Sequence, residues 1–212
     1  MSAAMKTTFL AALAALGLSL ATPVYAADTP VTAGGYNDFG CAGGVASLGG
    51  SPACVGLTRP ANTTPYANGQ LVCAPTCAPL TIVAGRQGQT SSGSGLIDKV
   101  VLLKTGPTTT PTFNIFLYSN TPTFAGLADQ SAYVGPYKAD ITSGIYVGQA
   151  TCSTGQATSD GSPGTFYVCS LDAQAISYRT TGKTLFAAIE ATSTYTPVSG
   201  ESFYVVTYEL QD

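Results

Sequence analysis

The chain has 212 residues, 45% of them hydrophobic, which is enough to bury the core of one domain. Only 9% are charged, against about 25% in ordinary soluble proteins. The net charge is −3 and the lysines and arginines are scattered, which argues against direct nucleic-acid binding. The chain contains no histidine, which excludes a Ser-His-Asp triad. The 24 glycines, 13 prolines and many threonines favour short strands joined by turns, so we predict an all-β fold.

Residues 1–26 have the pattern of a secretory signal peptide. Lys6 precedes an apolar run from Phe9 to Ala21, a helix-breaking Pro23 follows, and the segment ends on the small residue Ala26. A retained helix or membrane anchor is the alternative, but the run is shorter than the roughly 20 residues that span a bilayer. We therefore predict cleavage after Ala26, an extracellular location, and no stable membrane insertion after cleavage.

The chain contains six cysteines, and this even number agrees with export to an oxidising compartment, where disulfides are stable. Proximity along the chain favours three local disulfides. These would pair Cys41 with Cys54, Cys73 with Cys77, and Cys152 with Cys169. A zinc site is the competing interpretation of the closely spaced Cys73 and Cys77, but the lack of histidine and the predicted export argue against it. We expect no metal.

Residues 27–60 are rich in glycine and alanine and show neither a helical nor a strand period. We predict an irregular N-terminal arm there, followed by one β-domain over residues 61–212. That domain opens with the segment Leu57–Val72, in which Asn68-Gly69 marks a tight turn before an apolar strand.

The centre of the chain contains two apolar segments, Leu96–Lys104 and Thr112–Tyr118, separated by turn residues. In the second, Phe113, Ile115 and Leu117 alternate with Asn114, Phe116 and Tyr118, which predicts a strand. We interpret the two segments as a β-hairpin with a long loop. Weaker strand patterns follow, and the stretch between Cys152 and Cys169 is predicted to be a projecting loop. Those weaker patterns lie at Ala132–Pro136, Ile145–Val147 and Thr165–Leu171.

The C-terminal stretch Thr184–Asp212 is predicted to form two strands around a polar turn. In the last strand, Phe203–Leu210, residues 204, 206, 208 and 210 lie on one face and residues 203, 205, 207 and 209 on the other, so one side should be the more apolar. The simplest architecture for all these elements is an antiparallel two-sheet β-sandwich, similar to a jelly roll.

The residues reveal no catalytic motif. The acidic residues stand singly, although carboxylates distant in sequence could converge as in a glycosidase. We expect no catalytic residues and no cofactor. The acidic residues considered are Asp98, Asp129, Asp140, Asp160, Glu190 and Glu201.

Four loop tyrosines are candidates for a protein or sugar contact surface, because aromatic rings with a polar tip favour interfaces. They are Tyr66, Tyr133, Tyr137 and Tyr195. Packing against strands is the alternative for them.

Three separated segments, in the right order, resemble a family of small structural proteins of tailed-bacteriophage virions. The first contains Arg59-Pro60-Ala61 and Tyr66-Ala67, and the second runs from Phe113 to Phe124 (FNIFLYSNTPTF). The third runs from Tyr195 to Phe203 (YTPVSGESF) and continues to the final Glu-Leu-Gln-Asp. The resemblance covers about residues 57–212. It implies a non-enzymatic β-domain that decorates or completes a virion by binding other protein subunits.

Two functions from different classes follow from these observations. The first is an assembly subunit, either a virion decoration or accessory protein or a phage-derived surface protein. The alternative is a secreted adhesin or carbohydrate-binding module that uses the loop tyrosines to bind a glycan. A hydrolase with unrecognised carboxylates is the third and least supported hypothesis.

Overall fold

The computed structural model describes residues 53–83, 93–106, 109–158, 164–182 and 184–210, all of which belong to one structural unit. The predicted signal peptide, residues 1–26, lies outside the described residues, as do residues 27–52 of the predicted arm. The end of that arm is not irregular. Residues 53–58 form a strand that pairs with the C-terminal strand, so the β-domain begins at least as early as Ala53 rather than at residue 61.

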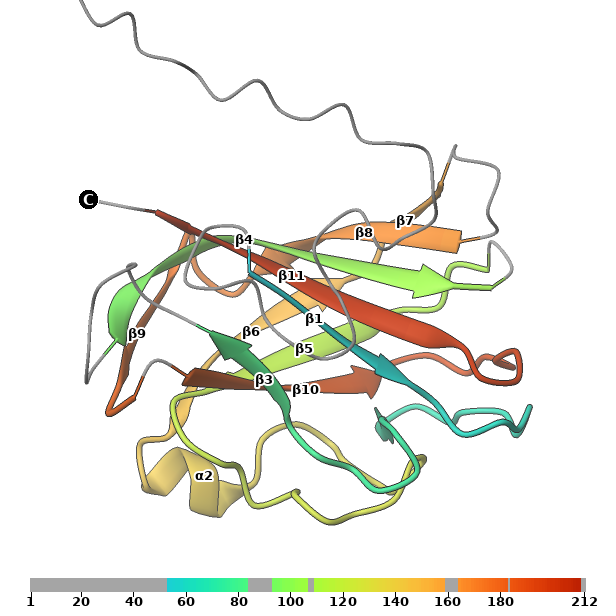
Figure 1. The fold of residues 1–212 in the computed structure, drawn as a ribbon, viewed down its shortest axis with the longest axis horizontal. Coiled ribbons are helices and arrows are strands. Elements are labelled where there is room, and N and C mark those ends of the chain that lie inside the picture. The colour runs from blue at the N-terminus through green and yellow to red at the C-terminus, as the bar shows by residue number, and fades with distance from the viewer. Residues whose placement is uncertain (1–52, 84–92, 107–108, 159–163, 183, 211–212) are drawn as a thin grey trace, which may run out of the picture. The chain divides into compact units, whose positions relative to one another are not determined.

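The described residues form two antiparallel sheets, which we call sheet 1 and sheet 2 (Figure 1). Sheet 1 has the order β1 (Ala53–Thr58), β11 (Ser202–Leu210), β4 (Gly93–Thr105), β8 (Gly164–Leu171), with β9 (Ile176–Thr180) beside the start of β4 and β7 (Gly155–Ala157) beside β8. Sheet 2 has the order β6 (Tyr146–Cys152), β5 (Phe113–Tyr118), β10 (Thr184–Ala191), β2 (Gln70–Val72), with β3 (Leu80–Val83) also paired to β10. The short helix α2 (Lys138–Thr142) lies between β5 and β6 in sequence. The predicted all-β antiparallel fold is confirmed.

The two sheets join along one edge, because β8 pairs with β4 along most of its length and with β6 at its end. The sheet therefore curls over on itself. The disulfide between Cys152 on β6 and Cys169 on β8 fastens this corner. The segment between these cysteines was predicted to project as a loop, but β7 pairs with β8 inside it and extends sheet 1.

Strands that follow one another in the chain mostly lie in opposite sheets. β4 belongs to sheet 1 and β5 to sheet 2, so the predicted hairpin of Leu96–Lys104 with Thr112–Tyr118 is wrong. β10 and β11 are likewise separated, one in each sheet. This crossing pattern is that of a jelly roll. Its physical reason is that both strands of each pair carry an apolar face, and packing these faces against each other across the sandwich buries more surface than pairing the strands side by side.

The main core lies between the sheets and is centred on Phe113. Its ring makes edge-to-face contacts with Tyr167, Tyr195 and Phe203 at centroid distances of 5.7, 5.6 and 5.4 Å. In β11 the residues at 203, 205 and 207 are buried in this core, so the residues at 204, 206, 208 and 210 point outward. The alternation predicted for this strand is confirmed.

A second apolar cluster covers the outer face of sheet 2. The chain between β5 and β6 folds back over this face, with α2 in it, and contributes Phe124 and Tyr133, which pack on Phe116 and Tyr118. The strand predicted at Ala132–Pro136 is not formed. Tyr133 is buried there, and its hydroxyl group hydrogen-bonds that of Tyr118. Among the described residues, no helix is long and apolar enough to cross a membrane.

Candidate functional site

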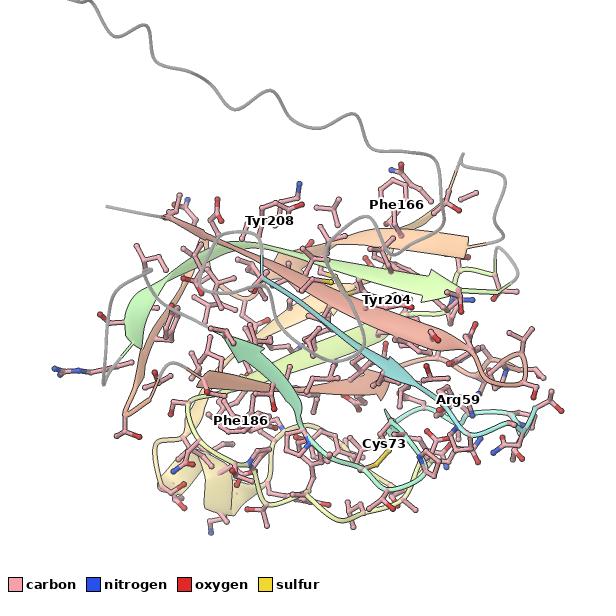
Figure 2. The ribbon with its side chains drawn as sticks, viewed as in Figure 1. Arg59, Cys73, Phe166, Phe186, Tyr204 and Tyr208 are labelled. Atoms are coloured by element: carbon pink, nitrogen blue, oxygen red, sulfur yellow. A yellow bond between two sulfur atoms is a disulfide. The ribbon has the colours of Figure 1, made fainter. Side chains whose placement is uncertain are left out.

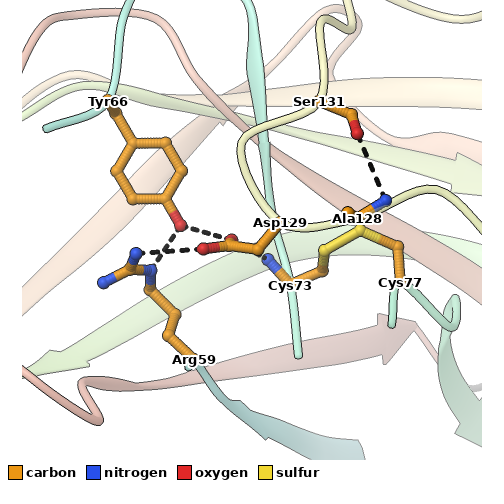
Figure 3. The surroundings of a disulfide bond; sticks show 7 residues. All are labelled: Arg59, Tyr66, Cys73, Cys77, Ala128, Asp129 and Ser131. Carbon is orange, nitrogen blue, oxygen red and sulfur yellow. Dashed lines mark hydrogen bonds and ion pairs between the residues drawn. A yellow bond between two sulfur atoms is a disulfide. The ribbon is translucent and has the colours of Figure 1, made fainter. Parts of the chain in front are cut away.

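A buried polar cluster lies where the chain leaves β1 (Figure 3). Nη2 of Arg59 donates to Oδ2 of Asp129 at 3.0 Å, and Nε of the same guanidinium donates to the hydroxyl oxygen of Tyr66. That hydroxyl donates in turn to Oδ1 of Asp129, and the backbone N–H of Cys73 donates to the same oxygen at 3.0 Å. The cluster thus ties the end of β1 to the loop that the Cys73–Cys77 disulfide closes between β2 and β3.

A second buried ion pair adjoins this cluster through stacked tyrosines. Nζ of Lys104 donates to Oε1 of Glu201 at 2.7 Å, and both side chains are buried. Burial raises the pKa of Glu201, while the hydrogen bond from Lys104 opposes that rise. The hydroxyl of Tyr195 lies 3.5 Å from the other carboxylate oxygen, and the ring of Tyr195 stacks on Tyr66 at 5.0 Å.

Both clusters pair a buried or nearly buried carboxylate with a buried cation. Each buried carboxylate accepts hydrogen bonds from its own partner, since Asp129 is matched by Arg59 and Glu201 by Lys104. Burying a charge is costly unless it is paired, so removing one partner alone would leave an uncompensated buried charge. The remaining acidic candidates are dispersed: Asp140 accepts from Thr123, Glu190 accepts from Asn114, Asp98 lies on β4, and Asp160 is outside the described residues.

The four candidate interface tyrosines do not form a surface. Tyr66, Tyr133 and Tyr195 are buried, and only Tyr137 is half-exposed, with its ring edge against Tyr133. Burial raises the pKa of Tyr66, Tyr133 and Tyr195 well above the usual tyrosine value. The expectation of a contact surface is therefore corrected for these three. They lie in loops, but the loops fold back onto the sheets, and large rings are a main source of buried apolar area.

An apolar surface does exist, on the outer face of sheet 1. The register aligns Tyr204 of β11 with Leu103 of β4 and Phe166 of β8. The next outward row aligns Val206 with Val101 and Val168, and the end of β11 aligns Leu210 with Leu96. Directly opposed residues on neighbouring strands share a face. The apolar or aromatic side chains on the outer face of sheet 1 are thus those of Cys54, Leu96, Val101, Leu103, Phe166, Val168, Tyr204, Val206, Tyr208 and Leu210.

This face is exposed at its flanks. Val168 is 55% exposed, Leu210 50% and Leu96 37%, so three of the large exposed hydrophobic side chains of the described residues lie on it. Phe166, Tyr204 and Tyr208 are half-buried along it (Figure 2). Lys99 shares the face, with its ammonium 4.9 Å from the ring centre of Tyr208.

Sequence reasoning found one strand of this surface and missed the rest. The alternation along β11 was visible in the sequence, whereas the contributions of Leu103, Phe166 and Val168 depend on which strands pair.

Two of the predicted disulfides are confirmed: Cys73 bonds Cys77, and Cys152 bonds Cys169. Cys54 is also disulfide-bonded, and Cys41 lies outside the described residues.

The described residues contain no group of three or more metal-ligating side chains. Comparisons with known proteins returned nothing: no family model, no curated protein and no solved structure matches this chain.

Proposed function

We propose that this protein is a non-enzymatic, exported assembly subunit, either a decoration or accessory protein of a phage virion or a phage-derived surface protein. It binds neighbouring protein subunits through the outer face of sheet 1. The observation that carries the proposal is the gathering of Leu96, Val168 and Leu210 on this one face, beside three half-buried aromatic rings. Large apolar side chains exposed on one face are typical of protein–protein contact sites.

The chemistry of the face suits a protein partner. Its aromatic and branched side chains gain about 25 cal/mol for each Å² of apolar surface that a partner removes from water. Lys99 also lies on this face, with its ammonium over the ring of Tyr208. When a partner docks, the charge of Lys99 therefore stays close to an aromatic ring. Tyrosine and phenylalanine are also enriched at interface cores.

The two faces of the sandwich differ in a way that supports this assignment. The outer face of sheet 2 is covered by the protein's own chain between β5 and β6. On the outer face of sheet 1, by contrast, Leu96, Val168 and Leu210 at its flanks are exposed. Jelly rolls occur in viral capsid proteins and in lectins, so the fold alone does not choose between assembly and sugar binding. The burial of Tyr66, Tyr133 and Tyr195 removes the main support for the glycan-binding alternative.

Native mass spectrometry of the full-length gene product, recovered from the culture medium and from the particle fraction, tests the proposal. We expect a discrete oligomer or particle-bound protein, with a mass that lacks residues 1–26. A protein found only as a free monomer in the medium would contradict assembly. A broad glycan array run in parallel tests the alternative, which specific binding to a sugar would favour.

A further inference from the structure

Glu190 is a buried carboxyl group without a cationic partner among the described residues. It is 4% exposed, and it is the only charged residue in the described strands of sheet 2, which are β2, β3, β5, β6 and β10. Asp129 and Glu201, by contrast, are each paired with a buried arginine or lysine. Burial without a cation favours the protonated form of a carboxyl group, so Glu190 takes up a proton more readily than an exposed glutamate does.

A row of hydrogen bonds runs from Glu190 across the outer face of sheet 2. Nδ2 of Asn114 on β5 donates to Oε2 of Glu190 on β10 at 3.2 Å. The hydroxyl group of Thr151 on β6 donates to Oδ1 of Asn114 at 3.1 Å, and Nε2 of Gln149 donates to the hydroxyl oxygen of Thr151 at 3.1 Å. The strand register explains the row, because Asn114 lies opposite both Glu190 and Thr151. We call these four residues the sheet 2 row.

Every donor in the sheet 2 row points towards Glu190. An ionised carboxylate only accepts hydrogen bonds, so it requires the N–H2 group of Asn114 and thereby sets the direction of each bond beyond it. Among the described residues, no group donates to the side-chain oxygen of Gln149, which lies at the far end of the row. The direction of the whole row is therefore tied to the charge of one buried group.

We propose that protonation of Glu190 reverses the sheet 2 row and so changes the outer group of Gln149 from a hydrogen-bond acceptor into a donor. The proton comes from solvent and binds Oε2. The new O–H donates to Oδ1 of Asn114, whose Nδ2 turns to donate to the hydroxyl oxygen of Thr151. That hydroxyl group then donates to the side-chain oxygen of Gln149, which leaves the N–H2 group of Gln149 for solvent or a partner.

Hydrogen bonding favours Oε2 of Glu190 over Oε1 as the position of the proton. Among the described residues, Oε1 has no hydrogen-bond partner, so an O–H there would lack the pairing that buried polar groups usually have. A proton on Oε2 has Oδ1 of Asn114 as its acceptor. Asn114 and Gln149 are half-buried rather than buried, which gives their amide groups room to turn. Bonds in one chain also polarise one another, so a reversal at one end spreads to the other.

Few other ionisable groups surround the sheet 2 row. Burial raises the pKa of Tyr133 well above the usual tyrosine value, and nearby carboxylates including Glu190 add to the rise, so Tyr133 stays neutral at acidic and neutral pH. Asp172 donates its backbone N–H to the carbonyl oxygen of Gln149, so its carboxyl group is the alternative source of a pH effect at the far end. The other ionisable residues on the elements packed around Glu190 are Tyr118, Asp129, Tyr137, Lys138, Asp140 and Tyr146.

The reversal gives this part of sheet 2 a hydrogen-bonding pattern that depends on pH. Ser170 on β8 lies opposite Thr151 and is exposed, so the row ends at an accessible place on the face. When Glu190 is ionised, Gln149 offers an oxygen there, and a partner that donates N–H groups is favoured. When Glu190 is protonated, a partner that offers carbonyl oxygens is favoured. This inference does not depend on the proposed function, which uses the outer face of sheet 1.

Hydrogen exchange of the Gln149 side-chain amide, measured by NMR on the purified full-length protein between about pH 4 and pH 7, tests the reversal. Thr151→Val is the reference, because it keeps the shape of the side chain and removes the hydroxyl group to which Gln149 donates. The ratio of the two exchange rates cancels the intrinsic pH dependence of exchange. At pH 7 we expect exchange to be roughly fivefold slower in the wild type than in Thr151→Val. As pH falls and Glu190 is protonated, the two rates should become equal.

Glu190→Gln is the matched control, because it cannot take up the proton that reverses the row. Compared with the double variant Glu190→Gln/Thr151→Val, it should keep the slow exchange of Gln149 at every pH. A wild-type ratio that stays constant over the range would overturn the proposal, since Glu190 would then be protonated without reversing the row. A ratio that still changes with pH in Glu190→Gln would also contradict it and would assign the effect to another group such as Asp172.

Discussion

A methyl group built on the α-carbon of Gly56 would lie 2.6 Å from Cδ1 of Tyr204, so the Tyr204 ring rests directly on the backbone of β1. The two residues are register partners on β1 and β11. This close approach places the ring against the backbone of β1 on the outer face of sheet 1. It shows why a residue without a side chain occupies that position.

Replacing Gly56 by alanine should therefore displace the Tyr204 ring and destabilise the fold. We expect a loss of about 1–3 kcal/mol in the free energy of unfolding, the usual cost of forcing an added methyl group into packed surroundings. Urea unfolding measures it. Gly182→Ala is the control, because nothing lies within 4 Å of the corresponding methyl position there. Equal stability of the two variants would show that the Tyr204 ring moves without cost.

The intact Lys104–Glu201 pair should add little to the free energy of unfolding, but removing only one of its two charges should lower that free energy strongly. Lys104→Met leaves the buried carboxylate of Glu201 without its ammonium partner. We expect a loss of about 3–5 kcal/mol for this single change. The double variant Lys104→Met/Glu201→Leu removes both charges and should recover at least half of that loss. A double-mutant cycle by chemical denaturation decides this, and additive losses would contradict the interpretation of the pair as mutually neutralising.

Glu190 should make stability depend on pH. Burial raises its pKa, and the hydrogen bond from Asn114 only partly opposes the rise. The folded state then binds the proton more tightly than the unfolded state, so stability is greatest below the unfolded pKa and falls as pH rises through the folded one.

The variant Glu190→Gln keeps the acceptor for Asn114 and removes the ionisation. We expect it to be more stable than the wild type at pH 7, with the difference shrinking towards pH 4. Thermal unfolding at several pH values measures this. A constant difference across that range would mean that Glu190 does not titrate differently in the two states.

The two disulfides whose cysteines are both described should contribute different amounts to the free energy of unfolding. The Cys152–Cys169 bond joins residues 17 apart in sequence and the Cys73–Cys77 bond joins residues 4 apart. On the loop-entropy account, their removal costs about 3 and about 2 kcal/mol respectively. Paired Cys→Ala variants compared by urea unfolding test the order. A larger loss from the shorter loop would indicate that the polar cluster around Asp129 depends on that bond.

The positions of the strands could be predicted better than their pairing. Alternating patterns located β5 and β11 to within one residue at each end, because inward and outward side chains differ along each of them. The predicted hairpin of Leu96–Lys104 with Thr112–Tyr118 is wrong because alternation is the same whether a strand pairs with the next one or faces it across a core. β1 was missed, since its glycine and small residues give no clear pattern.

The candidate site was predictable only in part, for a related reason. The outward face of β11 can be found from residues 204–210 alone. Its continuation through Phe166 and Val168 needs the β4–β8 register, which no local sequence pattern specifies. The loop tyrosines were misjudged because tyrosine suits both interfaces and cores, and the folding back of a loop such as 119–145 is a tertiary event.

The most direct test of assembly through the outer face of sheet 1 compares two charge substitutions by sedimentation velocity on the purified protein. Val168→Glu places a carboxylate on that face, whereas Val134→Glu places one at a more exposed valine, 87% against 55%, in the segment between β5 and β6. We predict that the wild type and Val134→Glu sediment as the same oligomer and that Val168→Glu sediments as a monomer. An oligomer unchanged by Val168→Glu would contradict the account.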